Sequence, residues 1–182
     1  MNFRVSFILL VLLAVVGGYV LFFELQREPK VEPQPPFFYN VQEQDITGVS
    51  VTYQGQRLAF AQKDNQWVFE DSGAPVDPNR WSGIPLLLSG PRAASVLLPQ
   101  LSNAAEYGLD PPETTIAITI SGGQEIDVLL GFKTPDGLSN YAQVVGFQSL
   151  LLVSASWGDV MNRLVTEPPV VTPAATPGPT QQ

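Results

Sequence analysis

The sequence predicts an α+β fold: an antiparallel β-sheet of meanders and hairpins with two short helices, preceded by one N-terminal transmembrane helix. Three observations support this prediction. Apolar and polar residues alternate in short stretches separated by turn residues, two later stretches carry apolar residues at helical spacing, and a long apolar run opens the chain. Because the order is strands, helix, strands, helix, we expect the helices to cover one face of the sheet.

The apolar run extends from Val5 to Phe23 without a charged residue. At about 1.5 Å per residue, roughly 20 apolar residues cross a hydrocarbon core of about 30 Å, whereas the apolar part of a cleaved signal peptide has about 7 to 15 residues. No cleavage motif of small residues follows the run. We therefore expect an uncleaved, single-pass anchor in the cell membrane, after a short flank of residues 1–4.

Charge decides the side of the membrane only weakly, because Arg4 and the terminal amine balance Arg27 and Lys30. The flank before the run is short and basic, which is typical of a signal anchor that exports the domain behind it. We therefore expect the domain on the extracytoplasmic side. Residues 24–40 are rich in proline and charge, and should form an extended stalk or simple connector.

The folded domain is expected over residues 41–166, and its first part indicates a meander of three strands. Apolar and polar residues alternate there with the period of a half-buried strand. Gln54-Gly55 and Lys63–Gln66 supply the two turns. The residues expected on the buried face are Val49, Val51, Tyr53, Leu58, Phe60, Trp67 and Phe69.

The first helix is expected to begin at Asp77-Pro78, because aspartate can cap free backbone amides and proline is tolerated in the first turn. Pro85 is expected to kink or end this helix, since proline removes a hydrogen bond from a helix interior. Gly90-Pro91 ends it in any case. The buried face of the helix would carry Trp81, Ile84 and Leu88.

The second part of the domain follows a short apolar connector at Ser95–Leu98 and a Gly- and Pro-rich turn at Ala104–Pro112, which we expect to divide the domain into halves. A hairpin is expected around the Ser121–Gly123 turn. Alternating patterns predict two further strands over Tyr141–Val145 and Leu150–Val153.

Ser156 is expected to cap the last helix, with Asp159 three residues on. Residues 167–182 are rich in proline and threonine and should form a disordered tail. The residues of the last helix that share one apolar face are Trp157, Val160, Met161 and Leu164.

The composition excludes several classes of function. The chain has no histidine and no cysteine, which excludes nucleophilic catalysis with a histidine base or a cysteine nucleophile, and a zinc site built from these residues. The net charge of −8 argues against nucleic-acid binding, which needs a clustered basic surface. A serine–lysine centre needs a desolvated lysine, but Lys63 and Lys133 lie in predicted turns. We expect no enzymatic activity and no cofactor.

Glu125 and Asp127 share one face of a predicted strand and could hold a cation, although any solvent-facing strand shows the same pattern. The loop Gly131–Asn140 is the better candidate binding site, because loops on a rigid scaffold often carry binding residues. Its Pro-Asp-Gly also fits a simple turn. The candidate residues of this loop are Lys133, Asp136, Gly137, Asn140 and Tyr141.

The three tryptophans, Trp67, Trp81 and Trp157, could line a groove, as aromatic side chains do for sugars and proline-rich peptides. All three fall on positions expected to face the core. We therefore favour core packing over a binding groove for these side chains.

Several motifs occur in a characteristic order: Gln66–Phe69 after a polar turn, a helix that opens at Asp77, Tyr107–Pro112, the strand pair Thr115–Gly131, and Gly137–Tyr141. In this order they resemble the bacterial family known as domain of unknown function forty-three-forty, over most of the predicted domain. Tyr-Gly-Leu-Asp-x-Pro is the most specific of these motifs. The resemblance implies a membrane-anchored envelope protein with no assigned activity, and some relatives accompany transporter-like or gliding-related membrane machinery.

Two functions are compatible with these patterns. The first is a single-pass membrane protein that presents a small non-enzymatic α+β domain, as an accessory or assembly subunit of a bacterial envelope or membrane complex with a protein partner. The alternative is an extracytoplasmic module that binds a small ligand or polysaccharide. Exposed tryptophans would favour the alternative, and fully buried ones would count against it.

Overall fold

The structure is a computed structural model that describes residues 38–171. The predicted anchor Val5–Phe23, most of the predicted stalk and the last eleven residues of the predicted tail lie outside the described residues. Between Phe38 and Val171, no helix combines the length and the apolar character needed to span a membrane.

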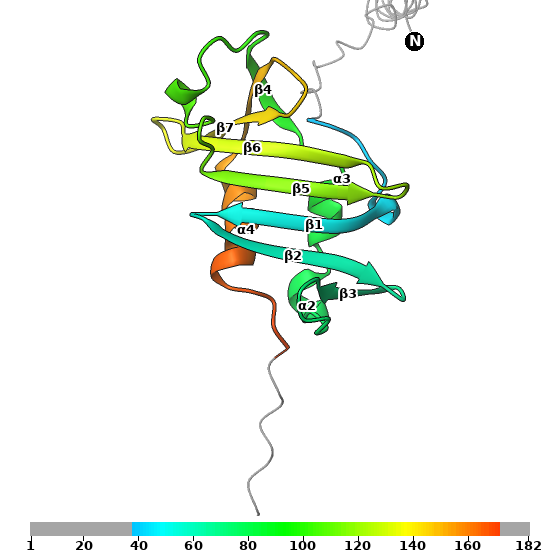
Figure 1. The fold of residues 1–182 in the computed structure, drawn as a ribbon. Helices are drawn as coiled ribbons and strands as arrows, with labels where there is room; N and C mark the ends of the chain where they lie inside the picture. Colours follow the sequence, from blue (N-terminus) through cyan, green and yellow to red (C-terminus); the bar gives the residue numbers. More distant parts are fainter. Residues whose placement is uncertain (1–37, 172–182) are drawn as a thin grey trace, which may run out of the picture. The chain divides into compact units, whose positions relative to one another are not determined.

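One antiparallel sheet of eight strands organises the described chain, in the order β3-β2-β1-β5-β6-β7-β8-β4 (Figure 1). This confirms the predicted antiparallel α+β class, including the first meander and the hairpin around Ser121–Gly123. The strands are β1 (Ile46–Tyr53), β2 (Gln56–Lys63), β3 (Gln66–Phe69), β4 (Ala93–Leu98), β5 (Thr114–Ile120), β6 (Glu125–Lys133), β7 (Ser139–Val144) and β8 (Leu150–Ser154).

The two predicted halves of the domain meet in the middle of this sheet. β1 pairs with β5 along nearly its whole length, with Val49 opposite Ile118 and Val51 opposite Ile116. All four side chains are buried, so they form a continuous core across the junction. Ala104–Pro112 therefore lies between the two halves in sequence, while the sheet joins them into one core.

Within residues 38–171, three α-helices, where two were expected, cover one face of the sheet: α2 (Pro78–Trp81), α3 (Ile84–Ser89) and α4 (Ala155–Thr166) (Figure 1). Asp77 caps α2 as predicted, with its Oδ1 accepting a hydrogen bond from the Asn79 amide at 2.9 Å. The expected single helix is broken between Trp81 and Ile84. Pro85 lies in the first turn of α3, where its missing N–H costs little, so it starts a helix instead of ending one.

α4 begins two residues earlier than predicted, at Ala155, with Ser154 in place of Ser156 at the N-cap position. Ser156 is inside the helix and its hydroxyl pairs with that of Ser154 at 2.7 Å, so the predicted cap is wrong. Asp159 forms an ion pair with Lys133 at 2.8 Å instead. The predicted buried face is confirmed for Trp157, Met161 and Leu164, while Val160 is half-buried.

The stretch predicted as an apolar connector is β4, the last strand of the sheet. It pairs with β8, with Val96 opposite Leu151 and Leu98 opposite Leu150. Its sequence does not alternate, because most of its side chains are exposed on both sides and no buried face imposes a period of two.

The chain after β4 returns over the sheet face opposite the helices. In this segment the 3₁₀-helix η3 (Ala105–Tyr107) places the Tyr107 ring on Tyr141 of β7, with ring centroids 5.0 Å apart. Gly131 of β6 lies directly beneath, where any Cβ would collide with the Tyr107 carbonyl oxygen. The absence of a side chain at Gly131 is therefore what allows the segment to lie against the sheet.

Both ends of the described chain pack on the domain, beyond the predicted limits of 41 and 166. Before the 3₁₀-helix η2 (Glu43–Asp45), Phe38 is buried, its ring stacks on Trp157, and its amide donates to the Pro91 carbonyl at 3.1 Å. Burial raises the pKa of the neighbouring Tyr39. At the other end, the Asp77 amide donates to the Pro169 carbonyl at 2.8 Å. The stalk and tail predictions are therefore wrong for residues 38–40 and 167–171.

Candidate functional site

The predicted binding loop is shorter than expected, because β6 continues to Lys133 and β7 begins at Ser139. Asp136 accepts hydrogen bonds from the Thr134 hydroxyl and the Leu138 amide, and these bonds lower the pKa of its carboxyl below the ordinary value. Gly137 has a φ of 73°, which a turn at this position requires. Asp136 and Gly137 are thus occupied in closing the turn, and Lys133 in its ion pair with α4.

Asn140 and Tyr141 lie on opposite faces of β7. Asn140 is buried toward α4, with its Oδ1 close to where a Cβ of Gly158 would lie, and its amide nitrogen donates to the Gly131 carbonyl at 3.2 Å. Tyr141 points the other way and contacts Tyr107. The five predicted loop residues therefore do not converge on a common cavity, and each makes a contact within the domain.

The acidic pair predicted on one strand face lies on β6, where Glu125 is exposed and Asp127 half-buried. Across residues 38–171, no three acidic, histidine or cysteine side chains gather closely enough to hold a metal ion. The solvated interpretation of this pair agrees with its exposure.

The three tryptophans differ in their surroundings. Trp81 and Trp157 are buried, as predicted for core residues, and the Trp157 indole donates to the Leu87 carbonyl at 3.0 Å. Trp67 is half-buried and lies against Trp81, with ring centroids 5.1 Å apart. Two tryptophans thus support core packing, while the third opens onto the surface.

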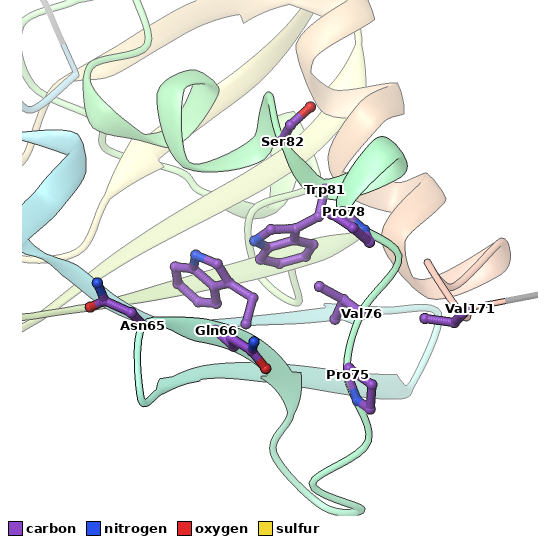
Figure 2. A pocket seen from close by; sticks show the side chains of 9 residues that line it. Asn65, Gln66, Pro75, Val76, Pro78, Trp81, Ser82 and Val171 are labelled. Atoms are coloured by element: carbon purple, nitrogen blue, oxygen red, sulfur yellow. The ribbon is translucent and has the colours of Figure 1, made fainter.

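Trp67 and Trp81 line a cavity within residues 38–171 with a volume of about 420 Å³, which we call the tryptophan pocket (Figure 2). This volume lies within the usual range for small-molecule sites, about 300–1,000 Å³. Figure 2 shows the Trp81 ring in the middle of the group, with Val76 and Val171 on one side and Asn65 on the other. The remaining lining residues are Gln66, Pro75, Pro78 and Ser82.

Local chain geometry positions the walls of the pocket. Asp64 and Asn65 both have positive φ, so a tight hairpin turn leads directly into β3 and presents Trp67. Asp77 fixes the start of α2, which places Pro78 and Trp81 on the opposite wall. A backbone bridge between Val76 and Val170 places Val171, the C-terminal residue of the pocket wall, beside the cavity.

The pocket is suited to an uncharged ligand, because none of its nine lining residues carries a charge. The Trp81 Nε1 is buried and makes no hydrogen bond within the described part of the chain. Such an unpaired buried N–H costs about 1–3 kcal/mol, so an acceptor that reached it would be stabilised. Asn65, Gln66 and Ser82 add polar groups at exposed positions.

A second surface feature lies at the other end of the sheet. β4 is paired on one side only within the described residues, and its sequence Ala-Ala-Ser-Val-Leu-Leu is uncharged. The side chains of Val96 and Leu97 are 46% and 44% exposed. The neighbouring helix α3 exposes Leu86 and Leu87 as well. We call Ala93–Leu98 the open edge.

Sequence reasoning named Trp67 and Trp81 as a less favoured groove but missed the C-terminal wall of the pocket. The only available signal was the apolar pair Val170-Val171 within an otherwise polar, proline-rich stretch. It also missed the open edge, because the mostly apolar sequence of β4 does not alternate and resembles a buried connector.

Comparison with known proteins gives no further guidance on either feature. No family model, no curated protein and no solved structure matches the chain.

Proposed function

We propose that the chain is a single-pass membrane protein whose α+β domain works without catalysis, as an accessory or assembly subunit of a bacterial envelope or membrane complex. The open edge carries this proposal. Long runs of apolar residues at an unpaired sheet edge promote association, and monomeric proteins commonly protect such edges with charge, proline or a covering segment. None of the residues Ala93–Leu98 is charged or proline.

The partner we infer is a protein that adds an extended segment beside β4. Strand addition uses the free backbone groups of the edge for affinity and alternate side-chain contacts for specificity. β4 pairs irregularly with β8 near both of its ends, so the regular contact would centre on Ser95 and Val96.

The membrane part of the proposal rests on the sequence. Val5–Phe23 would anchor the chain, with the domain on the extracytoplasmic side, and the envelope role is the one that the resemblance to family forty-three-forty would imply. The alternative ligand-binding function draws support only from the tryptophan pocket, since Trp81 and Trp157 are buried.

Photocrosslinking in intact membranes tests the partner. A benzophenone amino acid at Leu97 should give one discrete adduct of higher mass, because Leu97 is exposed on the open edge. The matched control carries the same group at Gln124, an exposed residue in the β5–β6 turn. Equal, diffuse labelling at both positions would contradict the proposal.

Cysteine labelling tests the side of the membrane, and the chain has no cysteine of its own. Single Ser72→Cys and Gln124→Cys variants place a thiol in exposed turns. A membrane-impermeant maleimide should label both in intact cells. Labelling that occurs only after lysis would place the domain in the cytoplasm and overturn this part of the proposal.

A further inference from the structure

We propose that the tryptophan pocket binds the chain's own segment 172–182, with Pro173 packed against Trp67 and Trp81. This segment lies outside the described residues, and it continues directly from Val171, which is itself part of the pocket wall. The proposal concerns the pocket and is independent of the partner suggested for the open edge.

Several contacts hold residues 167–170 beside the pocket. The Arg80 guanidinium donates to the Glu167 carbonyl at 2.7 Å and to the Pro168 carbonyl at 2.8 Å. Val170 then pairs with Val76, which lines the pocket. These contacts hold residues 167–170 in place against the start of α2, so the residues that follow start out at the edge of the cavity.

The chemistry of the segment matches that of the pocket. None of the side chains in its sequence Thr-Pro-Ala-Ala-Thr-Pro-Gly-Pro-Thr-Gln-Gln is charged, and none of those in the pocket walls is, in a protein with a net charge of −8. Proline-rich segments in the polyproline conformation dock against aromatic side chains. In that conformation, at about 3.1 Å per residue, Pro173 would reach roughly 6 Å beyond Val171, which lines the cavity.

The same conformation leaves backbone carbonyls without internal hydrogen bonds. The Trp81 indole N–H, which has no acceptor within the described residues, is a donor that such a carbonyl would satisfy. Because the segment is tethered, its effective concentration at the pocket is of millimolar order, so even a weak contact would be occupied.

Fluorine NMR of the full chain in detergent micelles tests this inference, with fluorotryptophan at the three tryptophan positions. The signals are assigned by single Trp→Phe substitutions. Pro173→Asp would place a charge in the apolar pocket and should shift the Trp67 and Trp81 signals to the positions seen when the chain is truncated after Val171. Thr180→Asp, with the same charge near the end of the segment, should leave them unchanged.

Trp157 is the internal control, because it lies against Phe38 and Leu87 and does not line the pocket. A synthetic peptide of residues 172–182, added to the truncated chain, should return the two signals toward their original positions. If truncation and Pro173→Asp leave Trp67 and Trp81 unshifted, the inference is wrong. If the signals of the intact chain move on dilution, the occupant comes from a second copy, which also overturns it.

Discussion

The two edge strands of the sheet, β3 and β4, differ in whether another part of the chain covers their outer side. At the β3 edge, the chain folds back on itself: the Phe69 amide donates to the Ala74 carbonyl and the Val76 amide to the Trp67 carbonyl, at 2.9 and 3.1 Å. At the open edge, β4 has no such cover within the described residues. Aromatic side chains pack near the β3 edge as well, where the ring centroids of Trp81 and Phe60 lie 4.4 Å apart.

This difference indicates that the two edges have different roles, one in stability and the other in association. Closing an edge with the chain's own backbone removes it from association, whereas an apolar, uncharged edge remains available to another strand. We therefore expect substitutions at the β3 edge to change the stability of the domain, and substitutions at the open edge to change its association.

The largest effect is expected for Trp81→Ala at the closed edge. The buried ring contacts Phe60 and Trp67, and its removal leaves a cavity in the core. The free energy of unfolding should fall by about 3–5 kcal/mol, as for other buried aromatic truncations. Urea denaturation of the full chain in micelles, followed by the fluorine NMR signal of fluorotryptophan at Trp157, measures this. Trp67→Ala should cost clearly less, since that ring is half-buried; equal losses would contradict this account of the edge.

A smaller effect is expected for Asp77→Ala. Its carboxylate caps α2 at the Asn79 amide, and loss of an N-cap typically costs about 1 kcal/mol. The same denaturation experiment should show this loss. Asp77→Asn retains an oxygen that can accept the hydrogen bond, so it should keep most of the stability. If asparagine destabilises as much as alanine, the cap is not the source of the effect.

The smallest effect on stability is expected for Val96→Lys at the open edge. Val96 is about half exposed, so the free energy of unfolding should change by no more than about 0.5 kcal/mol. The same substitution should abolish the adduct formed from Leu97, because an edge lysine opposes strand addition. Phe69→Lys at the closed edge is the matched comparison and should lower the free energy of unfolding, since Phe69 is buried. A Val96→Lys protein that keeps its adduct would show that β4 is not the docking edge.

Local features of the fold could be predicted from particular residues. Gln54-Gly55 forms the expected two-residue turn with positive φ, and the alternation of Ile116 and Ile118 marks a buried strand face. In each case the decisive interactions lie within a few residues of one another, so the local sequence is enough to specify them.

The candidate sites could be predicted only in part. Trp67 and Trp81 were recognisable as aromatic candidates, but their joint pocket depends on a wall that comes from Val171, about ninety residues further on in the chain. Lys133 and Asp136 looked available for binding because sequence does not show that Asp159 and Thr134 occupy them.

The sequence by itself determined the turns, the buried face of most strands, the cap at Asp77 and the absence of histidine and cysteine chemistry. Only the tertiary structure decided that β1 pairs with β5, that β4 forms an edge strand, and that the chain before Val171 returns to α2. The physical reason is that a strand's pattern specifies which side chains are buried but not which strand lies beside it. Loop-closure entropy grows only slowly with separation, so distant and near partners compete on similar terms until the whole core is packed.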